Sequence, residues 1–551
     1  MEGVNMNTGI PHATFDETTP VLIVGGSLVG LSTALFLRWR GIPSLVVERH
    51  PAPARLPRAR AINPRTMELF RALDLESTIR AASSPISGNN EILRVESLAG
   101  REIERLVEGG ADDLKAASPT SWGSIDQDQL EVILLTRLQS MGADIRFNTE
   151  LLSLEQDEQG VSALIRERAS GNTRQVRANY LVGADGNHST VRDALGFSRL
   201  GPGTISHATN IIFEADLGEV LRGRQIMLCY ISNPLLPDGQ GFLMPIDNKR
   251  RWMFSSSLHP ERGERREDLT DECCIEQIRI AVGVPDLEIK ILPAYPWDTV
   301  KVGMWELTAL YAEQYQRGRV FLAGDAAHAI LPTGALGAST GIQDAFNLAW
   351  KMALILKGQA APSLLASYEE ERFPVGKLMV EQTMQRFFYR TGSGSSSLID
   401  DASLIFGYRY QRGAIVAELD SAEAPLAQHP STLSGEPGTR APHIVLQRAR
   451  ERLSTIDLFG RNFVLLAGEE GTPWMTAART VADRLGIALD VWQIGPEGLC
   501  DVEGRWYTTY GVSTTGTILV RPDGFVAWRS SELREQPEQV LLDVLTRILG
   551  K

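Results

Sequence analysis

Residues 25–30 read Gly-Gly-Ser-Leu-Val-Gly and directly follow the apolar run 21–24. A glycine turn between a strand and a helix brings backbone amides and a helix N-terminus against a pyrophosphate. Ser27 stands in place of the second glycine, and its hydroxyl could donate to a phosphate oxygen. Glu48 ends the next apolar strand, 18 residues after Gly30, where an acid binds a ribose hydroxyl. The stretch predicts a dinucleotide site; the alternative is an ordinary turn between strand and helix.

Two later strands also end in a turn that carries an aspartate. Residues 180–192 run from an apolar strand into Asp185, and residues 319–328 run from another strand into Asp325. An aspartate at a strand end can accept a hydrogen bond from a sugar-alcohol hydroxyl, and the amides of a following helix start stabilise negative charge on a reduced ring. The run of small residues after Leu331 lets a backbone lie against a flat ligand.

Alternating elements must position these motifs. A helix over 28–41 and a strand over 44–50 complete a βαβ unit with the first strand, and Pro64 opens a helix over 64–70. Short alternating segments over 92–106 and about 200–300 predict a separate antiparallel sheet.

The last part of the chain reads as a separate unit. The composition of residues 390–397 is typical of a flexible loop, and the turn-rich stretch 429–443 precedes a tail of about 110 residues. Strand patterns on either side of a helix near 473–485 predict a small α/β domain in that tail.

Composition excludes several classes of protein. The chain has 551 residues, 43% hydrophobic content and a net charge of −13, which argues against nucleic acid and anionic membranes as partners. The four cysteines form no C-x-x-C pair and no metal-ligand spacing, so neither a disulfide scaffold nor a metal site is expected. The N-terminus has no secretory pattern, and no apolar run reaches the roughly 18 residues of a spanning helix. A cytoplasmic protein is expected.

In their order and spacing, GGSLVG…VVER, ADGNHSTVR and GRVFLAGDAAHAILPTG…GIQDAFNLAWK resemble the class A flavoprotein monooxygenases, which have the p-hydroxybenzoate hydroxylase fold. Within that family the chain is most similar to the actinomycete hydroxylases of aromatic polyketides, aklavinone hydroxylases among them. The resemblance implies an α/β fold with a Rossmann-like FAD-binding domain, an inserted antiparallel-sheet substrate domain and a C-terminal thioredoxin-like domain that lacks a redox C-x-x-C. The implied parts are a flexible arm (1–19), the FAD-binding domain (20–90, 107–198 and 303–388), the substrate-binding sheet domain (91–106 and 199–302), a linker and loop near the active site (389–430) and the thioredoxin-like domain (431–551).

The same resemblance implies non-covalent FAD, with NADPH as a transient co-substrate on a surface groove. The residues implied at FAD are Gly25, Ser27 and Gly30 at the pyrophosphate with Leu28 and Val29 of the same motif, Glu48 on the ribose, Arg49, Arg58 and Gln127 along the cofactor, Leu151 at the adenine through its backbone, Asp185 in the second motif, Asp325 on the ribitol, and Pro332, Gly337, Ala338 and Ser339 beside the isoalloxazine. The family often reads G-G-x-G-x-N in that last loop, so Ala335 and Ser339 are departures.

Two residues are expected at the substrate. Tyr230 matches a tyrosine that lines the pocket of the related polyketide hydroxylases, and Arg409 matches an arginine proposed there to assist proton movement. The alternatives are a core aromatic for Tyr230 and a surface ion pair for Arg409. Other conspicuous residues are expected to be structural: His328 at a helix start beside the flavin, Asp344 in helix packing, inert Cys273 and Cys274, and the run 369–372 on a solvated helix face. Trp297 and Trp305 are expected in the core or an interface, with stacking platforms as the alternative.

The implied reaction begins with reduction of FAD by NADPH. O2 then adds at the flavin C4a, and the resulting hydroperoxide hydroxylates a phenolic polycyclic polyketide in antibiotic or pigment biosynthesis. Baeyer–Villiger insertion or epoxidation on a similar substrate would share every motif. A flavoprotein that sequesters a polyketide without turnover, and a C-terminal domain that serves as an interaction module, are alternatives from other classes. The protein is expected to be a monomer or homodimer.

Overall fold

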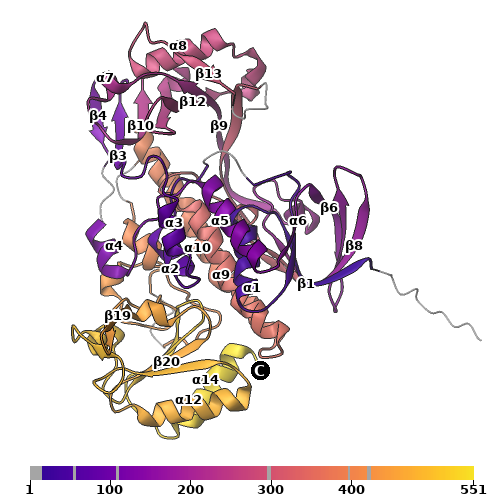
Figure 1. The fold of residues 1–551 in the computed structure, drawn as a ribbon, viewed down its shortest axis with the longest axis vertical. Helices are drawn as coiled ribbons and strands as arrows, with labels where there is room; N and C mark the ends of the chain where they lie inside the picture. The colour runs from indigo at the N-terminus through magenta and orange to yellow at the C-terminus, as the bar shows by residue number, and fades with distance from the viewer. Residues whose placement is uncertain (1–14, 54–57, 107–110, 294–299, 395–397, 419–423) are drawn as a thin grey trace, which may run out of the picture.

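A computed structural model describes residues 15–53, 58–106, 111–293, 300–394, 398–418 and 424–551. Three units follow one another along the long axis of the molecule: a sheet domain, a central domain and a C-terminal domain (Figure 1). No helix among these residues is long and apolar enough to cross a membrane.

The central domain is built on an eight-stranded sheet. Its main path has the order β15-β16-β8-β1-β2-β5, and the hairpin β6-β7 extends it antiparallel from β8. The strands are β1 (Glu17–Val24), β2 (Ser44–Val47), β5 (Asp144–Arg146), β6 (Thr149–Gln156), β7 (Val161–Glu167), β8 (Thr173–Gly183), β15 (Gln316–Arg317) and β16 (Val320–Leu322). β1 pairs in parallel with both β2 and β8, and β16 pairs in parallel with β8. Residues 21–24 are buried because helices cover this sheet, as parallel strands require.

Helices of the central domain cover the sheet and carry the motifs. They are α1 (Leu28–Trp39), α2 (Pro64–Arg71), α3 (Glu76–Ala81), α4 (Ala111–Ala117), α5 (Gln127–Ser140), α6 (Thr190–Ala194), the 3-10 turns η4 (Gly324–Ala326) and η5 (Pro362–Leu365), α9 (Gly337–Leu356), α10 (Ala366–Thr391) and α11 (Asp401–Phe406). Pro64 stands at the first position of α2, and the side chain of Asn63 caps that helix by accepting from the Thr66 amide at 2.9 Å. α1 packs against both α9 and α5.

The sheet domain is a nine-stranded sheet with a different helix on each face. Its strands are β3 (Glu91–Val95), β4 (Glu102–Arg105), β9 (Arg199–Glu214), β10 (Ile226–Ser232), β11 (Gln240–Pro245), β12 (Arg251–Leu258), β13 (Lys290–Leu292), β14 (Val302–Ala312) and β17 (His328–Ala329), with the helices α7 (Gly218–Leu221) and α8 (Asp271–Val282) and the 3-10 turns η1 (Pro237–Gly239), η2 (Pro260–Arg262) and η3 (Arg266–Asp268). Side chains alternate along β10. Cys229 and Ile231 join the core under α8, whereas Tyr230 faces Tyr389 of α10.

The C-terminal domain has the expected thioredoxin-like order. β20 (Phe463–Ala467) runs through α12 (Thr472–Leu485) into a parallel β21 (Leu489–Gln493), and the antiparallel hairpin of β23 (Thr517–Val520) and β24 (Val526–Ser530) follows. The remaining elements are β18 (Val445–Arg448), β19 (Glu451–Ser454), β22 (Cys500–Asp501), α13 (Trp506–Tyr510), α14 (Pro537–Leu549), η7 (Pro430–Thr432) and η8 (Thr455–Leu458). α14 packs against α12, and their apolar faces form one core.

The structure differs from the sequence-based expectations at two element boundaries and in the direction of one strand pair. Residues 17–19 are part of β1 rather than of a flexible arm, because Asp16 and the Glu17 side chain bond to Gln175 and Arg146. The sheet domain is not wholly antiparallel, since β3 and β10 pair in parallel. This pairing is possible because a long excursion of chain separates the two strands. Arg390 and Thr391, expected in a loop, form the last turn of α10.

The structure also shows the surroundings of individual residues that were expected to be structural. The run 369–372 does not form a solvated face, because Glu371 and Arg372 are fully enclosed and ion-paired. His328 lies in β17 rather than at a helix start, and it is buried. Trp305 is half-buried against the α10 side of the sheet, whereas Trp297 lies outside the described residues. Cys274 is buried in α8, and burial raises the pKa of its thiol to about 11, which keeps it in the unreactive protonated form.

Candidate functional site

Four parallel strands of the central domain end at the same level. Val24 is in register with both Val47 and Gly183, and Gly183 is in register with Leu322. The residues that follow these ends are therefore brought side by side at one edge of the sheet. Open α/β sheets bind their ligands outside the carboxyl ends of the strands.

The first glycine turn has the close packing that its sequence predicts. Gly25 has a φ of +108°, and a Cβ there would lie 2.2 Å from the carbonyl oxygen of Ala184. A Cβ on Gly30 would lie 1.8 Å from the carbonyl oxygen of Gly25. Neither position can hold a side chain, so the turn and the start of α1 stay open to a ligand that lies against the backbone.

Ser27 is engaged by the protein. Its hydroxyl donates to Glu131 Oε1 at 2.5 Å and accepts from Gln127 Nε2 at 3.1 Å. Both partners lie on α5, and Gln127 also donates to Glu131. The hydroxyl that could have served a phosphate therefore connects the glycine turn to α5.

Glu48 lies where a ribose acid is expected. Its carboxylate accepts from the amides of Gly26 at 2.7 Å and His50 at 2.8 Å. Burial alone would raise the pKa of Glu48, but these bonds, the His50 side-chain contact foremost, hold it below its usual range. A buried carboxylate fixed as an anion can accept from sugar hydroxyls.

The two aspartate motifs meet beside this turn. Asp185 accepts from the Ser189 hydroxyl at 2.5 Å, and Ser189 in turn caps α6. Arg192 of the same motif donates to the carbonyl oxygen of Ala326 at 3.2 Å, which connects the second motif to the third. Burial raises the pKa of Asp185.

Asp325 is the exposed residue in an otherwise buried stretch, 320–329. The residue is exposed, yet the protein atoms around its carboxyl raise the pKa by desolvation, against the lowering effects of His328 and Arg58. A carboxyl at this strand end can accept a hydrogen bond from a hydroxyl of a sugar-alcohol chain.

The starts of α1 and α9 lie next to the turn that carries Asp325. Val29 packs against Gly324 and Gly341, where a Cβ on either glycine would lie 2.7 Å from Val29 Cγ2. Two helix N-termini therefore face the same region and favour negative charge there. The fit of this site to FAD rests on these two N-termini, the backbone-only turn at Gly25 and the carboxyls at the strand ends.

The two departures from the family pattern are Ala335, in the loop before α9, and Ser339, in the first turn of α9. Ala335 has a φ of +52°, in the region that favours glycine. Ser339 is buried, and its hydroxyl accepts from the amide of Asn63 at 3.1 Å. Pro332 is exposed, and Gly337 and Ala338 are partly exposed.

The remaining predicted residues lie around this edge of the sheet. Leu28 is buried in the central core; Arg49 and Arg58 are exposed; the Leu151 side chain is also in the core, which leaves only its backbone for a ligand. The assignment of these positions to FAD stays a prediction.

Tyr230 and Arg409 lie in different places. Tyr230 packs edge-on against Phe242, with ring centroids 5.2 Å apart, and burial raises the pKa of its hydroxyl. Arg409 is buried; it donates to Gln428 at 3.0 Å, lies 4.0 Å from the Glu436 carboxylate and lines a cavity of about 390 Å³ with Phe373 and Leu426. The expected ion pair is therefore present, but it is formed by a buried arginine. No contact among the described residues joins Arg409 to Tyr230.

Arg386 of α10 is a candidate that sequence reasoning missed. A Cβ on Gly334, in the loop before α9, would lie 3.1 Å from its Nη1. The guanidinium is buried, pairs with Asp401 at 2.5 Å and donates to the Ile399 carbonyl at 2.8 Å. The sequence gives no local signal for Arg386, because it is one of many arginines. Only the folded chain places its guanidinium against the loop before α9.

Comparison with known proteins covers nearly the whole chain. The FAD binding domain family matches residues 18–383, and the C-terminal domain of aromatic-ring hydroxylases matches residues 434–551. Tetracenomycin A2 monooxygenase-dioxygenase of Streptomyces glaucescens is 40% identical over 97% of this chain and 97% of its own length. 4-Methyl-5-nitrocatechol 5-monooxygenase of a Burkholderia species is 40% identical over 97% of this chain and 98% of its own. The crystal structure of aklavinone-11 hydroxylase with FAD and aklavinone superimposes with a TM-score of 0.90, at 37% identity, over 98% of this chain and 100% of that one.

Proposed function

Because the chain belongs to the FAD-dependent aromatic-ring hydroxylase family, we propose that it uses NADPH and O2 to hydroxylate a phenolic ring of a polycyclic aromatic polyketide. The family, the fold class, the FAD cofactor and the monooxygenase class expected from the sequence are confirmed by these matches. The choice of NADPH, the position of attack and the ring system are the proposed part.

Aromatic side chains lie next to the loop that begins at Pro332 and is assigned to the isoalloxazine. Their arrangement supports the proposal of a flat, apolar substrate. Between the nine-stranded sheet and α10, Phe242 lies 6.3 Å from Phe387, centroid to centroid. Phe387 also packs in a cluster with Trp305 and Leu331, the residue before Pro332. One continuous apolar layer therefore connects Tyr230 to the loop assigned to the isoalloxazine. Aromatic side chains in this arrangement suit a fused ring system.

The protein's own contribution follows from this layer. When bound, FAD supplies the redox chemistry, taking electrons from NADPH and activating O2. The apolar layer excludes water from the reacting region, which protects a reactive oxygen species from wasteful decay. Tyr230 stays a neutral phenol because burial raises its pKa, so it can orient a substrate oxygen by donating a hydrogen bond to it.

The test is NADPH oxidation by the purified protein with a panel of tetracyclic and angular polyketides and, as a single-ring comparison, 4-methyl-5-nitrocatechol. Oxidation stimulated by a polycyclic compound, with one 18O atom incorporated from 18O2, is expected. A Baeyer–Villiger or epoxide product would replace hydroxylation in the proposal. Turnover of the nitrocatechol alone would overturn the substrate class. Bound FAD without turnover of any compound would favour a sequestering flavoprotein.

A further inference from the structure

We use the name flavin cradle for the turn at Gly324–Ala326 and the first turn of α9. Six charged side chains form a buried ion cluster next to it. It holds three acids and three bases, each at most 3% exposed: Asp344, Glu371 and Asp523, and Lys351, Arg372 and Arg521. These residues come from α9, from α10 and from the segment between β23 and β24. The cluster therefore spans the boundary between the central and C-terminal domains.

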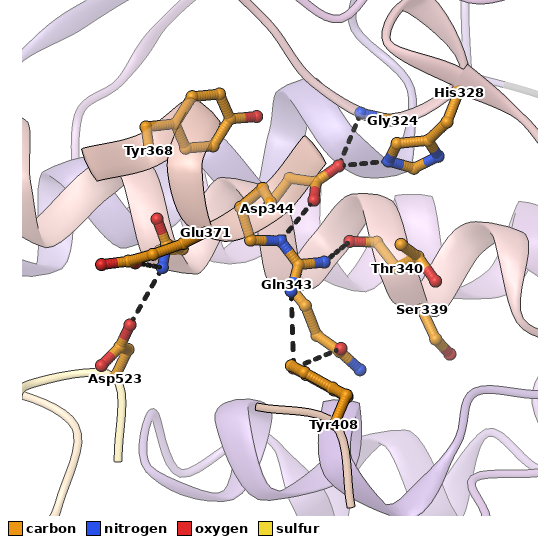
Figure 2. Close-up of polar contacts among 12 residues, drawn as sticks. Gly324, His328, Ser339, Thr340, Gln343, Asp344, Tyr368, Glu371, Tyr408 and Asp523 are labelled. Atoms are coloured by element: carbon orange, nitrogen blue, oxygen red, sulfur yellow. Dashed lines mark hydrogen bonds and ion pairs between the residues drawn. The ribbon is translucent and has the colours of Figure 1, made fainter. Parts of the chain in front are cut away.

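One end of the cluster holds the backbone of the flavin cradle. Asp344 accepts from the Gly324 amide at 3.1 Å and contacts His328 Nε2 at 2.6 Å, and Arg372 donates to the other oxygen of Asp344 at 2.7 Å (Figure 2). Arg372 also donates to the carbonyl oxygen of Thr340 at 3.2 Å. The same carboxylate and guanidinium thus fix both the turn that carries Asp325 and the first turn of α9.

Tyrosines connect this end to its surroundings. Tyr408 donates to Gln343 of α9 at 3.0 Å and accepts from Arg372 at 3.5 Å. The hydroxyl of Tyr410 lies 3.4 Å from Arg372 and 3.4 Å from Asn347. These bonds limit how far Arg372 can move relative to α9.

The other end of the cluster is supplied by the C-terminal domain. Arg521 donates two hydrogen bonds to the carboxylate of Glu371, at 2.7 and 2.8 Å, and also pairs with Asp523. Asn347 of α9 donates to both Glu371 and Asp523, at 2.7 and 3.2 Å. Because Glu371 precedes Arg372 on α10, the bidentate grip of Arg521 fixes the helix turn that presents Arg372.

Net stability does not explain such a cluster, since buried ion pairs can often be replaced by apolar residues at no cost in stability. Directional bonds do give a defined geometry. We propose that the buried ion cluster is a positioning device through which the C-terminal domain, by means of Arg521, sets the placement of the flavin cradle. This inference rests on the proposed use of FAD and gives the C-terminal domain a role at the flavin.

The test compares the full-length flavoproteins of Arg521→Met and Arg521→Lys with a matched control, Leu446→Ala. Leu446 is fully buried in β18 of the C-terminal domain and is not a member of the buried ion cluster, although its core includes Val520, the residue before Arg521. Arg521→Met is expected to raise the Kd for FAD by about 3- to 30-fold and to shift the visible spectrum and midpoint potential of the flavin. Arg521→Lys should restore part of both, while Leu446→Ala should lower Tm and leave the flavin unchanged.

Flavin properties in Arg521→Met that equal those of the wild type, or of the control at the same loss of Tm, would overturn the positioning role. If Arg521→Met does not fold, the Tyr408→Phe variant tests the proposal instead, because it deletes only the hydroxyl between Arg372 and Gln343. An unchanged Kd for FAD and an unchanged flavin spectrum in Tyr408→Phe would then overturn the proposal. Wild-type protein that binds no FAD would instead refute the proposed function.

Discussion

The hydroxyl of Ser27 donates to the carboxylate of Glu131 across 2.5 Å, so the residue that replaces the second glycine of the dinucleotide turn bonds to α5. Glu131 is fully buried, and Gln127 supports both groups. The side chain therefore fits into the protein scaffold. Serine at position 27 is compatible with a nucleotide-binding turn because its hydroxyl is directed at α5.

Ser27→Gly should change the Kd for FAD by less than about fivefold, since the lost hydroxyl is bonded to Glu131 and the net worth of one such bond is about 1 kcal/mol. Isothermal titration of the apoprotein with FAD measures this. Gly25→Ala is the control, because its Cβ would lie 2.2 Å from a carbonyl oxygen, and it should abolish binding. A loss of tenfold or more in Ser27→Gly would show that the hydroxyl serves the phosphate instead.

Ala335→Gly should stabilise the protein by about 1 kcal/mol, because Ala335 has a φ of +52° and glycine adopts this region without strain. Urea unfolding at pH 7 gives the free energy of unfolding. Ala449, exposed with a φ of 55°, is the matched position outside the flavin loop. Ala449→Gly should stabilise similarly and leave FAD binding unchanged. A destabilised Ala335→Gly would mean that the methyl group makes contacts worth more than the strain.

The glycine turn and the strand-end aspartates could be predicted from sequence because their determinants are local. Gly25 and Gly30 are required by contacts within the first βα unit and its neighbouring strand, and Glu48 follows the next strand. Short-range patterns of this kind carry the same meaning in any chain. They led to the FAD-binding domain, and the order of the three motifs led to the family.

The run 369–372 shows why the rest could not be predicted. Charged residues are ordinarily exposed, and a sequence pattern gives no sign of a buried partner. Glu371 is buried because Arg521, 150 positions later, and Lys351 bring charge to it. The parallel pairing of β3 with β10 has a similar origin, since it depends on chain excursions over more than a hundred residues.

The free energy of unfolding should fall on acidification because of His443. Burial, and then the charge of Arg440, lower the pKa of its imidazole to about 4. In the unfolded chain the pKa of the imidazole is about 6.5. Between pH 6.5 and 4 the unfolded state therefore binds a proton that the folded state does not, so stability is lost as the pH falls through this window.

His443→Gln should reduce the loss of stability between about pH 6.5 and 4 by about 1–2 kcal/mol, a figure reduced to allow for the partly exposed ring. Chemical unfolding at a series of pH values measures it. Wild type and variant should run parallel above pH 7, which serves as the internal control. A variant as acid-sensitive as the wild type throughout the window would remove His443 as the cause.

Tyr230→Phe should raise the KM for the polyketide by about 2- to 10-fold with little change in kcat, since it deletes one hydrogen bond to bound substrate and leaves the ring packed on Phe242. Steady-state kinetics with saturating NADPH measures both constants. Tyr180→Phe, in the central core, is the control. Unaltered kinetics in Tyr230→Phe would leave Tyr230 as a core aromatic.

The roles of Arg386 and Arg409 in hydroxylation can be distinguished by substituting each arginine with lysine. Arg386 lies beside the loop before α9, whereas Arg409 is bonded to Gln428 away from Tyr230. We expect Arg386→Lys to lower kcat/KM for hydroxylation by about tenfold or more, because lysine cannot reproduce a two-pronged guanidinium and the loop would shift. Arg409→Lys should change it by less than about threefold. FAD content and Tm are recorded for both, so that a fall in kcat/KM at full FAD loading reports the substrate step. The opposite ranking would return the proton-handling role to Arg409, and the cavity that it lines would then become the place to look for substrate.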